Sequence, residues 1–280
     1  MTLSTTLPAL AARTRRPPFT AVVRSEWIKA TSLPASVLAL AGILAIGLGG
    51  SLFLAVTLES SGVPSVASIE RTIADVTVPM VVLGQIIAGI FGVMTIGAEY
   101  SSGAMQTTLV AVPDRLRVLW AKTVVVFGLV TATALVTVFA SWAATNPVYA
   151  GYGLNAPLGA PGVLVALTGS AVYLGLCAVF GLGITAVVRS TTAGAIIVFA
   201  ATLLLPVLSS LLSFGLPSRI VRIALLGNAG DAMGRVGIEG GPFLDLWAGH
   251  ISVGAGWLIA AAWAIAGLAA GAVALRTRDA

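Results

Sequence analysis

Charged residues are scarce in this sequence of 280 residues, and their scarcity excludes a soluble enzyme. Only 9% of the residues are Asp, Glu, Lys or Arg, whereas 58% are hydrophobic and the mean hydropathy is +1.04. Soluble domains carry about 25% charged residues. A folded domain with so little charge cannot cover its surface with polar groups, while a lipid bilayer accepts apolar helix faces directly. Lipid is therefore the expected solvent.

Cysteine, histidine and lysine are also rare, which removes several kinds of chemistry. The single cysteine, Cys177, cannot form an intramolecular disulfide, and the single histidine, His250, has only Asp245 near it in the sequence. The only lysines, Lys29 and Lys122, do not follow a glycine-rich loop, so the P-loop of an ATPase is missing. No DxxxD or DDxxD run supplies paired carboxylates for a magnesium-bound substrate. We expect no catalytic residues, bound cofactor or metal in this chain.

Long apolar runs are what the sequence does contain. A helix needs about 20 apolar residues to cross a bilayer. Six runs of this kind lack Asp, Glu, Lys and Arg: Pro34 to Leu58, Val78 to Ala98, Thr123 to Ala144, Gly162 to Val188, Thr192 to Phe214 and Ile251 to Leu275. Only the polar stretch Arg189 to Thr192 separates the fourth from the fifth, so we expect a tight hairpin there. We predict an all-α integral membrane protein, in which residues 1–280 form one domain with six spans over residues 34–275.

The expected spans hold Gln85 and hydroxyl groups but no ionisable carboxylate or base. Ion-coupled carriers and channels usually place ionisable groups within the membrane. Energy for uphill transport is therefore expected to come from another polypeptide. Within the last span, Gly267 and Gly271 form a GxxxG pattern, which allows two helix backbones to approach closely.

Basic residues are distributed unevenly among the connections between these spans. Eleven of the 15 Lys and Arg residues fall in the two termini, the second-to-third connection and the fourth-to-fifth hairpin. Because Lys and Arg mark the cytoplasmic side, we expect a multi-pass protein with both termini in the cytoplasm. The first apolar run has about 25 residues, whereas the apolar core of a signal peptide has about 7 to 15 residues, so we expect an uncleaved first span. Arg15-Arg16 has little weight as a twin-arginine export signal, because Pro17-Pro18 follow it.

The segment before the first span has the pattern of an interfacial elbow helix. Apolar residues fall near one helical face and charged residues toward the other, namely Phe19, Val22, Val23, Trp27 and Ile28 against Arg24, Glu26 and Lys29. Pro17-Pro18 suit the start of this helix, and Pro34 suits a bend into the membrane. A simple membrane-surface anchor is the alternative interpretation.

Two connections contain candidate short helices. In the stretch Glu99 to Pro113, Met105, Leu109 and Val112 repeat at helical spacing beside hydroxyl and amide side chains, which predicts an amphipathic helix at the membrane surface. A passive interfacial loop is the alternative. In the glycine-rich stretch Gly215 to His250, the residues around Ile220 to Leu225 predict a helix on the outer side, as a gate or a structural cap.

The segment before the first span and the segment after the second span resemble the corresponding segments of ABC-2 type permeases. These permeases are the membrane subunits of ATP-binding cassette transporters, and the resemblance is to permeases that are common in high-GC Gram-positive bacteria. The run Arg24-Ser25-Glu26-Trp27-Ile28-Lys29 resembles the family's EWxK segment. The run Glu99-Tyr100-Ser101-Ser102-Gly103, followed by Thr107-Thr108-Leu109, Pro113, Arg115 and Lys122, resembles the family's EYSSGT…TTL…P.R…AK segment. Ala104 and Asp114 depart mildly from this pattern.

The resemblance implies a permease subunit in a bacterial plasma membrane, most simply an exporter. It implies a pair of separate cytoplasmic ATPase subunits that hold ATP and magnesium, and a second permease copy or paralogue; no nucleic acid is implied. The elbow helix would carry Arg24, Glu26, Trp27 and Lys29. The helix that couples to the ATPase would carry Glu99, Tyr100, Ser101, Ser102, Gly103, Met105, Thr107, Thr108 and Leu109.

Within that resemblance, we expect Glu99 to lie at the hinge with the second span and to pair with a basic residue. A membrane scaffold or sensor subunit that transports nothing is the second hypothesis, because it fits the same composition. An integral membrane enzyme ranks last, since no reactive constellation is present.

Overall fold

Six helices long and apolar enough to cross a membrane make up most of the computed structural model, which describes residues 17–61, 69–105, 110, 114–211, 215–237, 242–245 and 250–277. Span 1 is α2 (Pro34–Val56), span 3 is α7 (Arg115–Gly151), span 4 is α8 (Val163–Val188) and span 6 is α13 (Val253–Thr277). Span 2 joins α4 (Ile69–Pro79), the π-helical turn η1 (Met80–Gly84) and α5 (Gln85–Ser102). Span 5 joins α9 (Thr191–Phe199), the π-helical turn η2 (Ala200–Leu204) and α10 (Leu205–Leu211). The prediction of an all-α integral membrane protein with six spans is confirmed.

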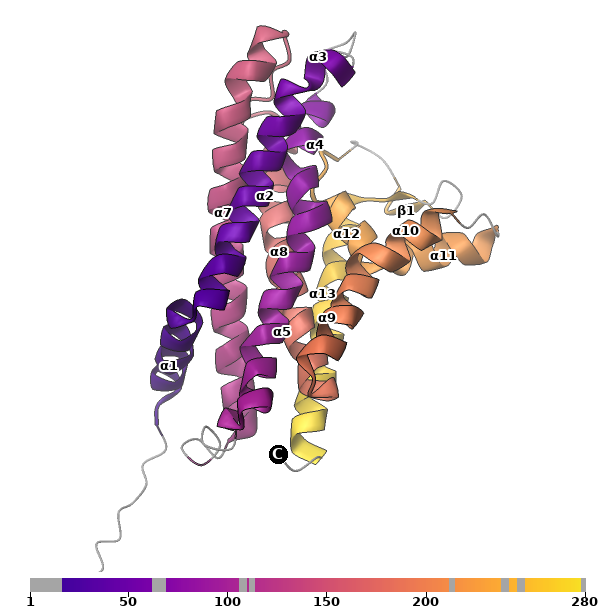
Figure 1. Ribbon diagram of the computed structural model, residues 1–280. Coiled ribbons are helices and arrows are strands. Elements are labelled where there is room, and N and C mark those ends of the chain that lie inside the picture. The colour runs from indigo at the N-terminus through magenta and orange to yellow at the C-terminus, as the bar shows by residue number, and fades with distance from the viewer. Residues whose placement is uncertain are drawn as a thin grey trace, which may run out of the picture.

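Shorter elements flank these spans (Figure 1). Helix α1 (Phe19–Ser32) precedes span 1, and α3 (Leu58–Ser61) follows it. Helices α11 (Leu216–Ala224) and α12 (Leu226–Met233) follow span 5. A small antiparallel pair, β1 (Leu244–Asp245) with β2 (His250–Ile251), precedes span 6. The strand pair was not predicted, and span 6 accordingly begins two residues later than expected.

Spans 2 and 3 are longer than the apolar runs that predicted them. Span 2 continues past its run to include Arg71, Asp75 and Glu99, and span 3 begins early enough to include Lys122. These charges are compensated inside the protein: Arg71 Nε lies 3.1 Å from Asp75 Oδ1, one helical turn away, and Lys122 pairs with Glu99. The apolar run therefore marks the hydrocarbon-facing part of each helix, while paired charges let the helix extend beyond it.

Helix α8 forms the centre of the bundle, where it packs against α5, α7 and α13 (Figure 1). In its most apolar stretch 72% of the residues are buried, against 17% in α2. The GxxxG expectation is confirmed at its contact with span 6, because a side chain at Gly183 would collide with the backbone of Gly267. Glycine at these positions is what lets the two helix backbones touch.

Two contacts between different spans identify one end of the bundle. At the end that carries α1, Arg115 Nη1 donates to the carbonyl of Leu275 at 3.0 Å, and the Arg189 guanidinium lies 5.6 Å from the centre of the Tyr100 ring. The second and fourth connections thus lie at the same end as the C-terminal end of span 6. Helix α4, which begins span 2, lies at the opposite end, as alternating connections require (Figure 1).

The two π-helical turns are joined by a buried polar cluster. Gln85, which follows η1, donates from Nε2 to the Thr202 carbonyl within η2 at 3.1 Å. The Tyr173 hydroxyl of α8 donates to Gln85 Oε1 at 2.5 Å and lies 3.2 Å from the carbonyl of Leu226 in α12. Spans 2, 4 and 5 and helix α12 therefore meet at one amide side chain. Isolated π turns of this kind are frequent at functional positions in helices.

Candidate functional site

Four charged side chains form a closed ring at the α1 end of the bundle. Lys122 Nζ of α7 lies 2.5 Å from Glu26 Oε2 of α1 and 2.8 Å from Glu99 Oε1 of α5. Lys29 Nζ of α1 closes the ring, at 2.8 Å from Glu26 Oε1 and 2.9 Å from Glu99 Oε1. The expected pairing of Glu99 with a basic residue is therefore confirmed, with two partners. We call these four residues the charge ring.

The charge ring corrects the predicted orientation of α1. Glu26 does not lie on a solvated face: its side chain is only 2% exposed, and it shares the buried face with Val22 and Ala30. Trp27 and Ile28, predicted to share the apolar face with Val22, are instead 48% and 54% exposed. The physical reason is the buried Lys122 of α7, which draws the Glu26 carboxylate inward, while lipid can accommodate an outward-facing Trp and Ile.

Lys122 is the most enclosed member of the ring, with a side chain that is 1% exposed. Its ammonium group makes three contacts, to Glu26, to Glu99 and to the Thr95 carbonyl at 3.3 Å, which match its three N–H donors. The hydrogen bonding of Glu99 is less complete, because its Oε2 is buried without a hydrogen-bond partner among the described residues. The ring carries two positive and two negative charges, so it is neutral as a unit.

Lys29 differs from Lys122 because its side chain is 43% exposed. Burial alone would lower the pKa of Lys29, but the hydrogen bonds and charges of Glu26 and Glu99 outweigh that effect and raise the pKa above its ordinary value. Lys29 therefore stays cationic at neutral pH, at the outer edge of the ring.

The remaining predicted coupling residues lie in the last turn of span 2 and directly after it. Tyr100 packs under Arg189, whose positive φ of 54° ends α8. Ser101 and Ser102 are exposed, and Gly103 ends α5 in the left-handed conformation with φ of 72°. Met105 is buried, at 3% exposure. Thr107, Thr108 and Leu109 lie outside the described residues, and so do Gln106 and residues 111–113 of the stretch predicted to form the amphipathic helix.

A cavity of about 610 Å³ lies beside the charge ring, between α1, the start of α2 and the end of α5. Its walls include Leu33, Pro34 and Ala98, and Lys29 and Glu99 also line it. This space could not be predicted from the sequence, because it depends on how α1 bends into span 1. The predicted elbow residues Trp27 and Arg24 are not among its lining residues.

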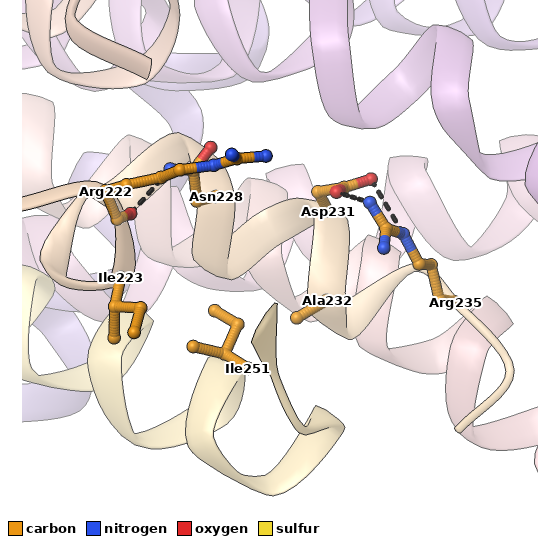
Figure 2. Close-up of a pocket in the computed structure, with 7 residues that line it drawn as sticks. All are labelled: Arg222, Ile223, Asn228, Asp231, Ala232, Arg235 and Ile251. Carbon is orange, nitrogen blue, oxygen red and sulfur yellow. Dashed lines mark hydrogen bonds and ion pairs between the residues drawn. The ribbon is translucent and has the colours of Figure 1, made fainter. Parts of the chain in front are cut away.

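At the opposite end, a much smaller pocket of about 60 Å³ lies beside α11 and α12 (Figure 2). Two interactions join its lining residues: Arg235 pairs with Asp231, and Asn228 Nδ2 donates to the Arg222 carbonyl. Helix α11 is mostly exposed, as predicted, whereas α12, which was not predicted, is buried against α8 and α13. This arrangement fits the structural cap better than a ligand site.

Sequence reasoning missed two residues that complete these clusters. Lys122 was not predicted to pair with a carboxylate, although a lysine directly before an apolar run was a usable signal for a paired charge. Asp75 was not considered, yet it is buried, bonded to Arg71, and accepts from the Tyr149 hydroxyl at 3.3 Å. No sequence pattern near Asp75 pointed to Tyr149, which lies 74 residues away.

Family models and curated proteins identify no relative of the chain. No protein-family model matches the chain, and no curated protein matches it. Among the residues that the structure describes, no group of three His, Cys, Asp or Glu side chains could hold a metal ion. The fold and the charge ring thus define an integral membrane protein with a buried ionic junction at one end.

Proposed function

We propose that the chain is the permease subunit of an ABC-2 type exporter in a bacterial plasma membrane, driven by a pair of separate cytoplasmic ATPase subunits. The observation that carries this proposal is the charge ring, which joins α1, span 2 and span 3 at Glu99, close to the end of span 2. A docked ATPase needs such a junction, because a displacement of the predicted coupling segment, which begins at Glu99, then moves three helices together.

The ring and its neighbours offer a route for movement into the bundle. Glu99 is held by two lysines from two other helices, so span 2 cannot shift at this end without α1 and α7. Tyr100, the next residue, contacts Arg189 at the connection between spans 4 and 5. Further along spans 2 and 5, the two π turns meet at Gln85, where the helical ladder is already interrupted. Rigid transmission at one end and deformable turns within the spans suit alternation between inward-open and outward-open states.

The proposal places both termini and the charge ring in the cytoplasm. The positive-inside rule supports this, because Lys29, Arg115, Lys122 and Arg189 all lie at the α1 end. A second permease copy or paralogue would complete the pathway for cargo. ATP and magnesium would bind the ATPase subunits and not this chain.

The test is co-expression of the full chain with candidate ATPases, followed by purification and measurement of ATP hydrolysis in lipid nanodiscs. We expect the permease to assemble with one ATPase and to stimulate its turnover. Gly103→Val, which is strained at φ of 72°, and Met105→Asp, which buries a charge, should reduce stimulation severalfold while the complex still forms. Arg219→Gln, at the opposite end on α11, is the matched control. Equal stimulation by all four proteins would contradict the proposal.

The second candidate is a scaffold or sensor subunit that assembles but transports nothing. Substrate-dependent ATP turnover in the reconstituted complex distinguishes the two. Assembly with an ATPase that no transported compound accelerates would favour the scaffold.

A further inference from the structure

We propose that the cavity beside the charge ring binds the headgroup region of a phospholipid, with Lys29 as the partner of the phosphate. The cavity measures about 610 Å³, and it lies at the junction of α1, α2 and α5. Ligand sites typically span about 300–1,000 Å³, whereas close-packed protein interiors leave few voids larger than a water molecule. The space is therefore large enough to hold a headgroup and its glycerol. The inference does not depend on the proposed transport function, because it concerns binding alone.

The depth of the cavity matches the headgroup layer of a bilayer. Leu33 and Pro34, which line it, stand at the start of span 1, and Ala98 stands in the last part of span 2. Both spans change there from apolar to polar sequence, which is where a membrane helix leaves the hydrocarbon core. Ala30 and Met94 complete an apolar wall suited to the upper acyl chains.

Lys29 is the accessible charge in this space. The side chains of Glu26, Glu99 and Lys122 are 2%, 11% and 1% exposed, whereas that of Lys29 is 43% exposed. Two of the three N–H donors of Lys29 bond carboxylates, and the third has no partner among the described residues. A cationic donor at the mouth of an apolar cavity favours a ligand with a phosphate oxygen and an acyl tail.

The same geometry disfavours a free anion. Glu26 and Glu99 form ion pairs with Lys29 and offset its charge, so a small anion gains little net attraction to this lysine. A phospholipid gains the additional apolar contact with the walls, worth about 25 cal/mol for each Å² of surface removed from water. The acyl chains are therefore as necessary for binding as the phosphate.

Native mass spectrometry of the full chain in detergent tests these requirements. Phosphatidic acid is titrated against diacylglycerol with the same chains, which lacks the phosphate, and against glycerol 3-phosphate, which lacks the chains. We expect phosphatidic acid to saturate one site, diacylglycerol to bind about tenfold more weakly, and glycerol 3-phosphate not to compete. Equal binding of phosphatidic acid and diacylglycerol overturns the phosphate contact, and competition by glycerol 3-phosphate overturns the choice of a lipid.

Two pairs of variants locate the site. Ala98→Trp fills the cavity, and Leu38→Trp adds the same side chain on an exposed face of α2 outside it. Lys29→Gln removes the proposed phosphate partner, and Arg24→Gln removes an exposed charge from the same helix. We expect loss of the saturable site in Ala98→Trp, about tenfold weaker phosphatidic acid binding in Lys29→Gln, and wild-type binding in both controls. If either test variant binds like its control, the assignment is wrong; thermal unfolding of each protein confirms that the folds are comparable.

Discussion

Lys122 Nζ lies 2.5 Å from Glu26 Oε2, although 96 residues separate them in the chain. This contact fixes α1 against span 3, and both side chains are almost completely buried. A buried ion pair contributes little net stability compared with apolar packing, but loss of one partner leaves an uncompensated charge. The pair therefore serves to hold α1, span 2 and span 3 in one arrangement at this end of the bundle.

Lys122→Met should destabilise the protein by about 3–5 kcal/mol, because it removes the enclosed cation and leaves the buried Glu26 and Glu99 carboxylates with only the 43% exposed Lys29. The double variant Lys122→Met with Glu26→Gln restores charge balance and should recover part of that loss. Thermal or denaturant unfolding in detergent measures both. Lys29→Gln, at the exposed edge of the ring, serves as the comparison and should cost no more than about 1 kcal/mol. A Lys122→Met protein as stable as Lys29→Gln would contradict the assigned role of Lys122.

The contribution of Lys29 should depend on pH only in the alkaline range. Because the pKa of Lys29 is raised above 10.5, the ammonium is fully present below that value in both folded and unfolded protein. Its contribution is then lost as the pH rises through the folded pKa. The difference in unfolding midpoint between wild type and Lys29→Gln should thus stay constant from pH 7 to about 9 and shrink above 10.5. A difference that disappears near pH 8 would mean that Lys29 is not held in the ring.

The sequence was sufficient to predict the six spans, because each needs about 20 apolar residues and six runs satisfy that length. It could not predict where Glu26 points. Helical periodicity gives the faces of α1, but the buried face is decided by a lysine on another helix. The extension of span 2 through Asp75 escaped prediction for the same reason, since charge within a membrane helix is tolerated only through partners that tertiary structure supplies.

Gly183→Ala should disturb the contact between spans 4 and 6. The new methyl group meets backbone atoms of Gly267, which cannot rotate away as a side chain could. Overpacking of this kind costs about 1–3 kcal/mol, measured as a lower unfolding midpoint in detergent. Gly128→Ala in α7 is the matched control, because a methyl group there meets nothing within 4 Å. If both variants unfold alike, the close approach of the two helices is not required.

Gln85→Leu should weaken the junction of the two π turns. The change removes the buried side-chain donor to the Thr202 carbonyl and leaves the Tyr173 hydroxyl with the more distant Leu226 carbonyl as its acceptor. A buried polar group left unpaired costs about 1–3 kcal/mol, and the expected result is a loss of that size in unfolding free energy. Thr168→Val, at an exposed hydroxyl of α8 bonded only within its own helix, should change the stability far less. Wild-type stability in Gln85→Leu would show that the cluster does not hold the spans together.

Thiol labelling can determine which side of the membrane the charge ring faces. Cys177 is fully buried, so the native cysteine should remain unlabelled in the folded protein. Val110→Cys introduces a thiol at a position that is 86% exposed, between spans 2 and 3, and Ile220→Cys introduces one on α11, where Ile220 is 55% exposed. An impermeant maleimide should label Ile220→Cys in intact cells and Val110→Cys only after permeabilisation, because the basic end is expected to face the cytoplasm. The reverse pattern would place the charge ring outside the cell, beyond the reach of a cytoplasmic ATPase, and would overturn the proposed function.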